Sequence, residues 1–294
     1  MAIKVYADAA SNLFKSFLEK KKLDIKVFPI ELSYEGKSYL CYSEDIDVPT
    51  MSKEFYQDMR EGMKPRTSLV NPQIILDAME EEVAKGNEIV YVTLSSGISG
   101  TYQTATLFAN EINEKYGRKY IHIVDSRTAG FGEGLIAMHV AKLVKEGKTF
   151  TEVCGDTEAY VSKVRSEFTV DDLKYLAQTG RISKLAAKIA NVLSIKPLLY
   201  GSDAGKIEVT SKEHGRLKAL KTLASQVCSH IRNPQDQTVY ISHCDSEGDA
   251  NKLKDMLLNK GIKNVEVYFY DLVTGSHVGP GTIAVFYEGE LRTI

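Results

Sequence analysis

The sequence has few cysteines, and none is spaced for a metal site or a disulfide framework. Cys41, Cys154, Cys228 and Cys244 lie far apart, and no two of them form a C-x-x-C pair. This spacing fits neither a zinc site nor the disulfide framework of a small secreted protein. We therefore expect free thiols, as in proteins of a reducing compartment.

Excess charge and long apolar runs are also lacking. The formal net charge is −2, which gives no bulk electrostatic reason to bind nucleic acid. No apolar run approaches the roughly 20 residues that span a bilayer. The first residues, MAIKVYADAAS, lack the pattern of a signal peptide. We expect a cytoplasmic protein without stable membrane insertion.

Histidines and acidic residues show no metal-binding pattern. The histidines include no pair at i, i+4 spacing beside a carboxylate, which a zinc hydrolase would need. Scattered aspartates such as Asp45 and Asp125 are expected to be surface or capping groups. The sequence therefore predicts neither a metal site nor a cofactor.

The order of strand and helix patterns predicts an α/β fold. In the first half they alternate, which is typical of βαβ units and an open sheet. The strand-like segments there are residues 3–8, 27–34, 88–94 and 120–124. The second half favours a mixed α+β domain, with strand-like segments at residues 167–170, 195–200, 206–210, 239–242, 265–270 and 282–287. No linker separates the halves, so the predicted domains 1–160 and 161–294 have a soft boundary.

The most informative local pattern is the run LSSGISGTYQ, which follows a strand-like segment and opens a helical one. Its glycines, Gly97 and Gly100, allow a tight turn and a close approach of the backbone to a ligand. The hydroxyls of Ser95, Ser96 and Ser99, with the free N–H groups of the first helical turn, predict a seat for an anion. The same residues also suit a simple strand–helix turn in which Ser99 only caps the helix.

This run lacks the motifs of three better-known site classes. A nucleophile elbow needs G-x-S-x-G, and Thr101 stands where its last glycine belongs. A Walker A loop needs a lysine after its second glycine, and a dinucleotide fingerprint needs G-x-G-x-x-G. Neither pattern occurs here. An acyl hydrolase that uses Ser99 and a domain that binds a small anion stay open as alternatives.

Two further segments combine polar side chains with turn or capping residues. Thr67 and Ser68 stand just ahead of a proline-led helix start, where ordinary capping also explains them. His277 lies in the glycine- and proline-rich segment 276–282, for which we predict a loop between two strands. Its imidazole would be able to donate to a carboxylate, although a surface histidine in a turn is the alternative.

Seven motifs in one order resemble those of the DegV family. They are D-A-A-S-N at 8–12, T-S at 67–68, L-S-S-G-I-S-G-T-Y at 94–102, D-S at 125–126, V-D-D-L to G-R-I-S within 170–183, I-K-P at 195–197 and H-V-G-P-G at 277–281. Each motif alone is weak, but the set covers essentially the whole chain. The sequence is therefore similar to a family of bacterial fatty-acid-binding proteins.

The resemblance implies a two-domain protein that holds a long-chain fatty acid in a deep apolar tunnel. By position, Thr67, Ser99 and His277 resemble the residues that bind the acyl carboxylate. The family implies a non-catalytic subunit that delivers the acid to an ATP-dependent fatty acid kinase, which forms an acyl phosphate for phospholipid synthesis. Arg181 is the candidate for kinase docking or a phosphate contact, with a solvated arginine beside a helix as the simpler interpretation.

Three departures from the family pattern stand out. Ala9 and Ala10 replace hydroxyl-bearing residues of the first motif, and Thr179 replaces a glycine before Gly180. The segment SKEHGR at 211–216 is a poor match to the basic segment of the family. The last two changes bear on the expected kinase contact rather than on lipid binding.

Overall fold

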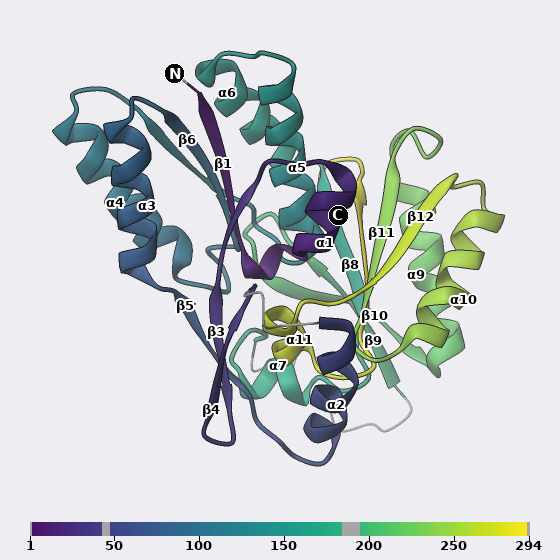
Figure 1. The fold of residues 1–294 in the computed structure, drawn as a ribbon. Coiled ribbons are helices and arrows are strands. Elements are labelled where there is room, and N and C mark those ends of the chain that lie inside the picture. Colours follow the sequence, from purple (N-terminus) through teal and green to yellow (C-terminus); the bar gives the residue numbers. More distant parts are fainter. Residues whose placement is uncertain (1, 43–47, 184–194, 293–294) are drawn as a thin grey trace.

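The computed structural model describes residues 2–42, 48–183 and 195–292. Strands and helices are interspersed along these residues, and the strands form three sheets (Figure 1). The predicted α/β class is therefore confirmed. Within these ranges, no helix has the length and apolar character needed to cross a membrane.

The first sheet is all parallel, in the order β2-β1-β6-β7. Its strands are β1 (Ile3–Asp8), β2 (Lys26–Phe28), β6 (Glu88–Thr93) and β7 (Ile121–Asp125). Helices α3 and α4 pack together on one face, and α5 and α6 cover the other (Figure 1). Their bounds are α3 (Pro72–Ala84), α4 (Thr101–Lys115), α5 (Phe131–Lys145) and α6 (Phe150–Val161). The β-branched β6 is almost wholly buried between these layers.

The second sheet has the order β10-β9-β8-β13-β11-β12. Its strands are β8 (Val164–Thr169), β9 (Ile195–Gly201), β10 (Ile207–His214), β11 (Thr238–His243), β12 (Asn264–Phe269) and β13 (Ile283–Glu288). β13 lies between β8 and β11 and is antiparallel to both. The predicted hairpin is confirmed as β9 and β10. The short strand expected at 167–170 is β8, which is longer and central.

Two separate core clusters cover the faces of the six-stranded sheet. Helices α9 (Arg216–His230) and α10 (Glu247–Asn259) bury one cluster against it, which includes Val285. The other face belongs to a larger cluster that extends into the parallel sheet and includes Phe286. The sheet changes at Val164, but the core continues past that residue, so the domain boundary near residue 160 stays a prediction.

The third sheet is antiparallel, in the order β4-β3-β5, and the sequence patterns do not predict it. Its strands are β3 (Ile30–Tyr34), β4 (Lys37–Cys41) and β5 (Arg66–Val70). The segment 27–34, predicted as one strand, is divided at Pro29 between the first and third sheets. Proline has no N–H to continue a ladder, which explains the break. Thr67 and Ser68, predicted to precede a helix, lie in β5.

Further helical segments lie between the strands. They are η1 (Ala9–Ser11), α1 (Lys15–Lys21), α2 (Val48–Arg60), α7 (Lys174–Gln178) and α11 (Leu272–Val278). The helix α11 corrects the loop predicted over 276–282, because His277 lies in its last turn. Asp271 caps it by accepting from the Thr274 N–H at 2.6 Å.

Candidate functional site

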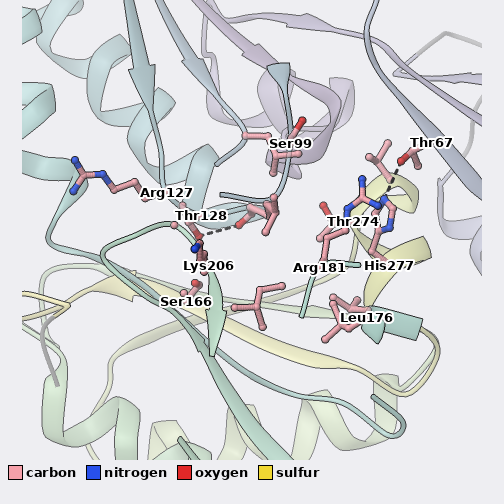
Figure 2. Close-up of a pocket in the computed structure, with 18 of the residues that line it drawn as sticks. Thr67, Ser99, Arg127, Thr128, Ser166, Leu176, Arg181, Lys206, Thr274 and His277 are labelled. Carbon is pink, nitrogen blue, oxygen red and sulfur yellow. Dashed lines mark hydrogen bonds between the residues drawn. The ribbon is translucent and has the colours of Figure 1, made fainter. Parts of the chain in front are cut away.

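A cavity of about 170 Å³ lies where the parallel strands end and the six-stranded sheet begins. Its walls come from β5, the β6–α4 loop, β8, α7 and α11 (Figure 2). The apolar lining includes Leu94, Ile98, Phe168, Leu176, Val273 and Phe286. The polar lining includes Thr67, Ser68, Ser99, Arg181, Thr274 and His277. A largely apolar cavity with a few converging polar groups is the usual form of a small-molecule site.

Thr67 and His277 are directly hydrogen-bonded across this cavity, with 2.8 Å between Thr67 Oγ1 and His277 Nε2 (Figure 2). The two residues are far apart in sequence, and β5 and α11 bring them together. Burial, helped by the positive charge of Arg181, lowers the pKa of His277 from 6.5 to about 4. The imidazole is therefore neutral near pH 7.

The surroundings of His277 indicate which of its nitrogens carries the proton. Nδ1 is buried and has no hydrogen-bond partner among the described residues. A buried N–H without an acceptor is costly, whereas an unused lone pair is better tolerated. We therefore assign the proton to Nε2, which donates to Thr67 Oγ1. The hydroxyl hydrogen of Thr67 is then free to donate to a ligand.

Ser99 lines the same cavity from the β6–α4 loop. Its Oγ lies 3.1 Å from Thr101 Oγ1 and accepts from the Thr101 N–H at 3.3 Å. Ser99 precedes the N-cap residue, Gly100, and bonds the first N–H of α4 from there, so it is not itself the helix cap that one interpretation of the sequence predicts. The structure brings Thr67, Ser99 and His277 to one cavity, and among these three Thr67 and His277 are hydrogen-bonded to each other.

The other serines and Gly97 of this loop hold the loop in shape. Ser95 is fully buried and donates to the Gly205 carbonyl at 2.7 Å. Ser96 donates to the Asp125 carboxylate at 2.5 Å. A Cβ on Gly97 would lie 2.4 Å from the Gly205 oxygen. Ser95, Ser96 and Gly97 therefore support the loop without lining the cavity.

Ser68 and Gly100 contribute less to the cavity than Thr67, Ser99 and His277. Ser68 lines the cavity, but its Oγ donates to the Leu69 carbonyl at 2.6 Å and accepts from the Glu31 N–H at 3.3 Å. A Cβ on Gly100 would approach Leu69 to 3.4 Å, an ordinary contact. Gly100 is the N-cap residue of α4 and makes no side-chain cap.

Arg181 is a half-buried residue of the cavity wall, which corrects the interpretation of a solvated arginine beside a helix. Its guanidinium donates to the Thr179 carbonyl and makes no ion pair with any described residue. Figure 2 shows it beside the imidazole of His277. Burial lowers its pKa, so the site would favour an anion that compensates this charge.

Thr274 and the apolar lining are residues that the sequence does not single out. Thr274 stands three residues before His277, and both face the cavity from one side of α11. This spacing is informative only once the segment is known to be helical. Phe168 and Leu176 carry patterns of ordinary core residues, and nothing in the sequence separates a cavity wall from a packed core.

No group of three or more metal-ligating side chains occurs within residues 2–42, 48–183 and 195–292. The four cysteines are unpaired, as expected. Ser99 has no histidine bonded to it, because His277 Nε2 is bonded to Thr67. The site therefore offers hydrogen-bond donors and the cationic side chains of Arg127, Arg181 and Lys206 around an apolar cavity.

Comparison with known proteins gives one family throughout. A family model described as "Uncharacterised protein, DegV family" matches residues 2–290. A DegV domain-containing protein of Clostridium perfringens is 38% identical and covers 98% of both chains. A DegV family crystal structure from Ruminococcus gnavus with vaccenic acid has a TM-score of 0.83 at 26% identity, covering 97% of this chain and 99% of that one. The Streptococcus pneumoniae fatty acid kinase (Fak) B3 protein, loaded with linoleic acid, has a TM-score of 0.80 at 19% identity, covering 99% and 100%.

Proposed function

The chain belongs to the DegV family, and we propose that it binds a long-chain fatty acid, with its carboxylate at Thr67, Ser99 and His277. The observation that carries this proposal is that these three residues line one largely apolar cavity together. The Ruminococcus gnavus protein, which has the same fold, holds vaccenic acid, and this likeness supports the choice of ligand.

The chemistry of the cavity suits an acyl chain with an anionic end. Each buried methylene contributes roughly 0.8 kcal/mol, so a long chain gains most of its affinity from the apolar lining. The hydroxyls of Thr67 and Ser99 would donate charge-assisted hydrogen bonds to the carboxylate. His277 orients the Thr67 hydroxyl through the bond from Nε2. Polar groups then fix the orientation of a ligand that the apolar wall binds.

We assign Arg181 to the anionic end of the ligand. Its guanidinium has no carboxylate partner among the described residues and lies beside His277 (Figure 2). A cation in this position stabilises a carboxylate and, more strongly, a phosphorylated head with its larger negative charge. Docking of a kinase at Arg181 is the less favoured assignment, since the residue belongs to the cavity wall.

We further propose that the protein presents its acid to an ATP-dependent fatty acid kinase, as a non-catalytic subunit. The carboxylate oxygen would attack the γ-phosphorus of ATP and release ADP, leaving an acyl phosphate on this protein. The motif resemblance supports this role. The Streptococcus pneumoniae kinase B3 protein shares the fold, which by itself supports the architecture alone.

Two other functions suit the site less well. An acyl hydrolase would need a base beside Ser99, and His277 is instead bonded to Thr67. A domain for small anions would have little use for the apolar lining. The acyl-binding proposal uses both the polar and the apolar parts of the cavity.

The test is binding of a long-chain acid and of the alcohol of the same length, with native mass spectrometry of the purified protein as a first step. Thr67→Val and Ser99→Ala should each weaken acid binding by roughly ten- to a hundredfold, because a hydrogen bond to a charged group contributes about 1.5–3 kcal/mol. Binding of the alcohol should change much less. Ser225→Ala, on the exposed face of α9, is the control.

Unchanged acid affinity in both variants would remove Thr67 and Ser99 from the site. An empty cavity together with turnover of an acyl ester would favour the hydrolase instead. Addition of the kinase from the same organism and ATP should yield an acyl phosphate, trapped with hydroxylamine. Acid binding without formation of the acyl phosphate would support the lipid-binding site and would refute the proposed role as a kinase subunit.

A further inference from the structure

The turn after β1, residues Asp8 to Asn12, is hydrogen-bonded to the two elements that carry Ser99 and His277 of the proposed carboxylate site. Its two polar ends, Asp8 and Asn12, are 0% and 1% exposed. Polar side chains this deeply buried are retained only with well-made hydrogen bonds. Ala9 and Ala10, which differ from the family motif, lie between them and are also buried. The two polar residues at the ends of the motif, Asp8 and Asn12, are retained.

Asp8 holds the start of the loop that leads to Ser99. Its Oδ1 accepts from the Ala10 N–H at 2.9 Å, which closes the turn on itself. Its Oδ2 accepts from the Leu94 N–H at 3.1 Å. Leu94 is the first residue after β6, and Ser95 follows it directly. The carboxylate of Asp8 therefore fixes the point at which the serine loop leaves the sheet.

Asn12 holds the start of the helix that carries His277. Its Oδ1 accepts from the Asp271 N–H, and its Nδ2 donates to the Phe269 carbonyl, both at 2.9 Å. Asp271 is the N-cap of the seven-residue α11. Asn12 thus bonds to the backbone on both sides of the β12–α11 junction. Its own backbone is in the left-handed region, with φ of 60°, which asparagine adopts readily.

We propose that Asn12 is a positioning residue for the carboxylate site, which sets the place of α11, and so of His277, relative to the serine loop. Thr67 is coupled to His277 through their hydrogen bond, whereas the Ser99 hydroxyl is hydrogen-bonded to Thr101 and not to either of them. The five-residue turn links the two halves, with Asp8 on the serine loop and Asn12 on α11. The inference rests on the proposed binding of a carboxylate by both halves at once.

The physical reason is that a carboxylate needs donors from both halves at hydrogen-bond distance together. A displacement of one half by about 1 Å breaks this geometry without emptying the apolar cavity. Loss of Asn12 should therefore affect the acid head of a ligand more than its tail. A purely structural role for Asn12 would lower stability and leave the preference for acid over alcohol unchanged.

The test is Asn12→Gly, because glycine keeps the left-handed backbone and removes both side-chain hydrogen bonds. We expect acid affinity to fall by about tenfold or more, and alcohol affinity by less than about threefold. In a His277→Ala background, Asn12→Gly should cost less than about twofold more, because α11 then no longer positions the imidazole that orients the Thr67 hydroxyl.

Asn113→Ala is the control, since the Asn113 side chain likewise bonds only to backbone, with three hydrogen bonds to Tyr120 and Ile121 at the start of the edge strand β7. It should lower stability without changing the preference for acid over alcohol. If Asn12→Gly behaves like Asn113→Ala, or if its effect adds fully to that of His277→Ala, the inference is overturned. A wild-type protein without preference for the acid would overturn the proposed function together with it.

Hydrogen exchange on the wild-type protein keeps the inference testable if Asn12→Gly does not fold. Binding of the acid should slow exchange of the Leu94 and Asp271 amides, which the turn holds, more than exchange of the Tyr120 and Ile121 amides. The alcohol should slow all four amides alike. Equal protection of the four by the acid would contradict a link between the turn and the ligand head.

Discussion

At the scale of the residue, His277 contributes to the site without carrying a charge. Burial keeps its imidazole neutral at physiological pH, and its Nε2–H fixes the orientation of the Thr67 hydroxyl. The positive charge that acts on this imidazole belongs to Arg181 instead. In the proposed complex, a neutral donor pair beside Arg181 would hold the carboxylate and only partly neutralise it, which would suit a head group that is to react further.

The lowered pKa of His277 predicts a change of stability with pH. Between about pH 4 and 6.5 the unfolded imidazole binds a proton and the folded one does not. Its contribution is therefore fully present above pH 6.5 and is lost as the pH falls towards 4, by about 3 kcal/mol at most. Urea unfolding at pH 7 and pH 4.5 should show a smaller difference for His277→Gln than for the wild type.

His214→Gln is the control, because His214 is an exposed histidine on β10. This variant should keep the wild-type difference between the two pH values. The same result for His277→Gln would mean that the imidazole takes up its proton over the same pH range in the folded and the unfolded protein. In that case burial would not lower the pKa of His277.

Sequence motifs could identify Thr67, Ser99 and His277 as candidates, because hydroxyl and imidazole groups beside turn glycines are recognisable chemistry. The structure brings them to one cavity, but their contact with a carboxylate stays a prediction. The place of Arg181 was not accessible in this way, since arginine is usually solvated and its burial depends on the packing of α7. The lining residues were not accessible either, because an apolar side chain has the same pattern in a core and in a cavity wall.

At the scale of the element, the β6–α4 loop packs closely against the β9–β10 hairpin. Gly97 and Gly205 meet backbone to backbone, and Ser95 donates across the same contact. A methyl group on Gly97 would lie 2.4 Å from the Gly205 oxygen and 2.7 Å from its carbonyl carbon. The contact joins the serine loop to the six-stranded sheet. A movement of the loop relative to the sheet would therefore break this contact.

Gly97→Ala should therefore destabilise the protein by about 1–3 kcal/mol, the usual cost of overpacking, and should weaken acid binding through displacement of Ser99. Urea unfolding and acid titration measure the two effects. Gly155→Ala in α6 is the matched control, because its methyl group would meet nothing within 4 Å. That control should be neutral or stabilising by up to about 1 kcal/mol. A Gly97→Ala protein as stable as the wild type would show that the β9–β10 hairpin can move away from the added methyl group without cost, and would contradict the prediction.

Most elements follow from local sequence patterns, and two that do not, the helix α11 and the three-stranded sheet, have clear physical causes. The helix α11 contains glycine, threonine and valine, which favour other conformations, but the Asp271 cap and contacts with α7, β3 and β5 stabilise it. The three-stranded sheet depends on pairing of β5 with β3, more than 30 residues away in sequence. Local periodicity carries no information about such a pairing.

At the scale of the whole molecule, buried carboxyl groups connect stability to pH in the sense opposite to His277. Burial raises the pKa of Asp8 to about 6 and that of Asp271 to about 7, and it raises the pKa of Glu133 well above its usual range. The folded-state pKa values lie above the unfolded ones. This contribution is therefore fully present below about pH 4 and is lost as the pH rises through 7.

Asp271→Asn should reduce this loss, by on the order of 3–4 kcal/mol between pH 4 and pH 8. The variant keeps Oδ1 as the acceptor for the Thr274 N–H. Urea unfolding across this range measures the effect, with Asp255→Asn on the exposed side of α10 as the control. A pH profile of Asp271→Asn that coincides with that of the wild type would show that Asp271 is ionised in the folded protein at low pH.

The position of β13 has a consequence for how the chain matures during synthesis. β8 and β11 have no partner on one side until residues 283–288 have left the ribosome, because β13 fills the place between them. The parallel sheet needs nothing beyond β7 and can form earlier. A nascent chain would therefore carry a finished first sheet beside two exposed strand edges. Phe286 lines the cavity from β13, so the proposed binding site would be complete only after β13 has taken its place in the sheet.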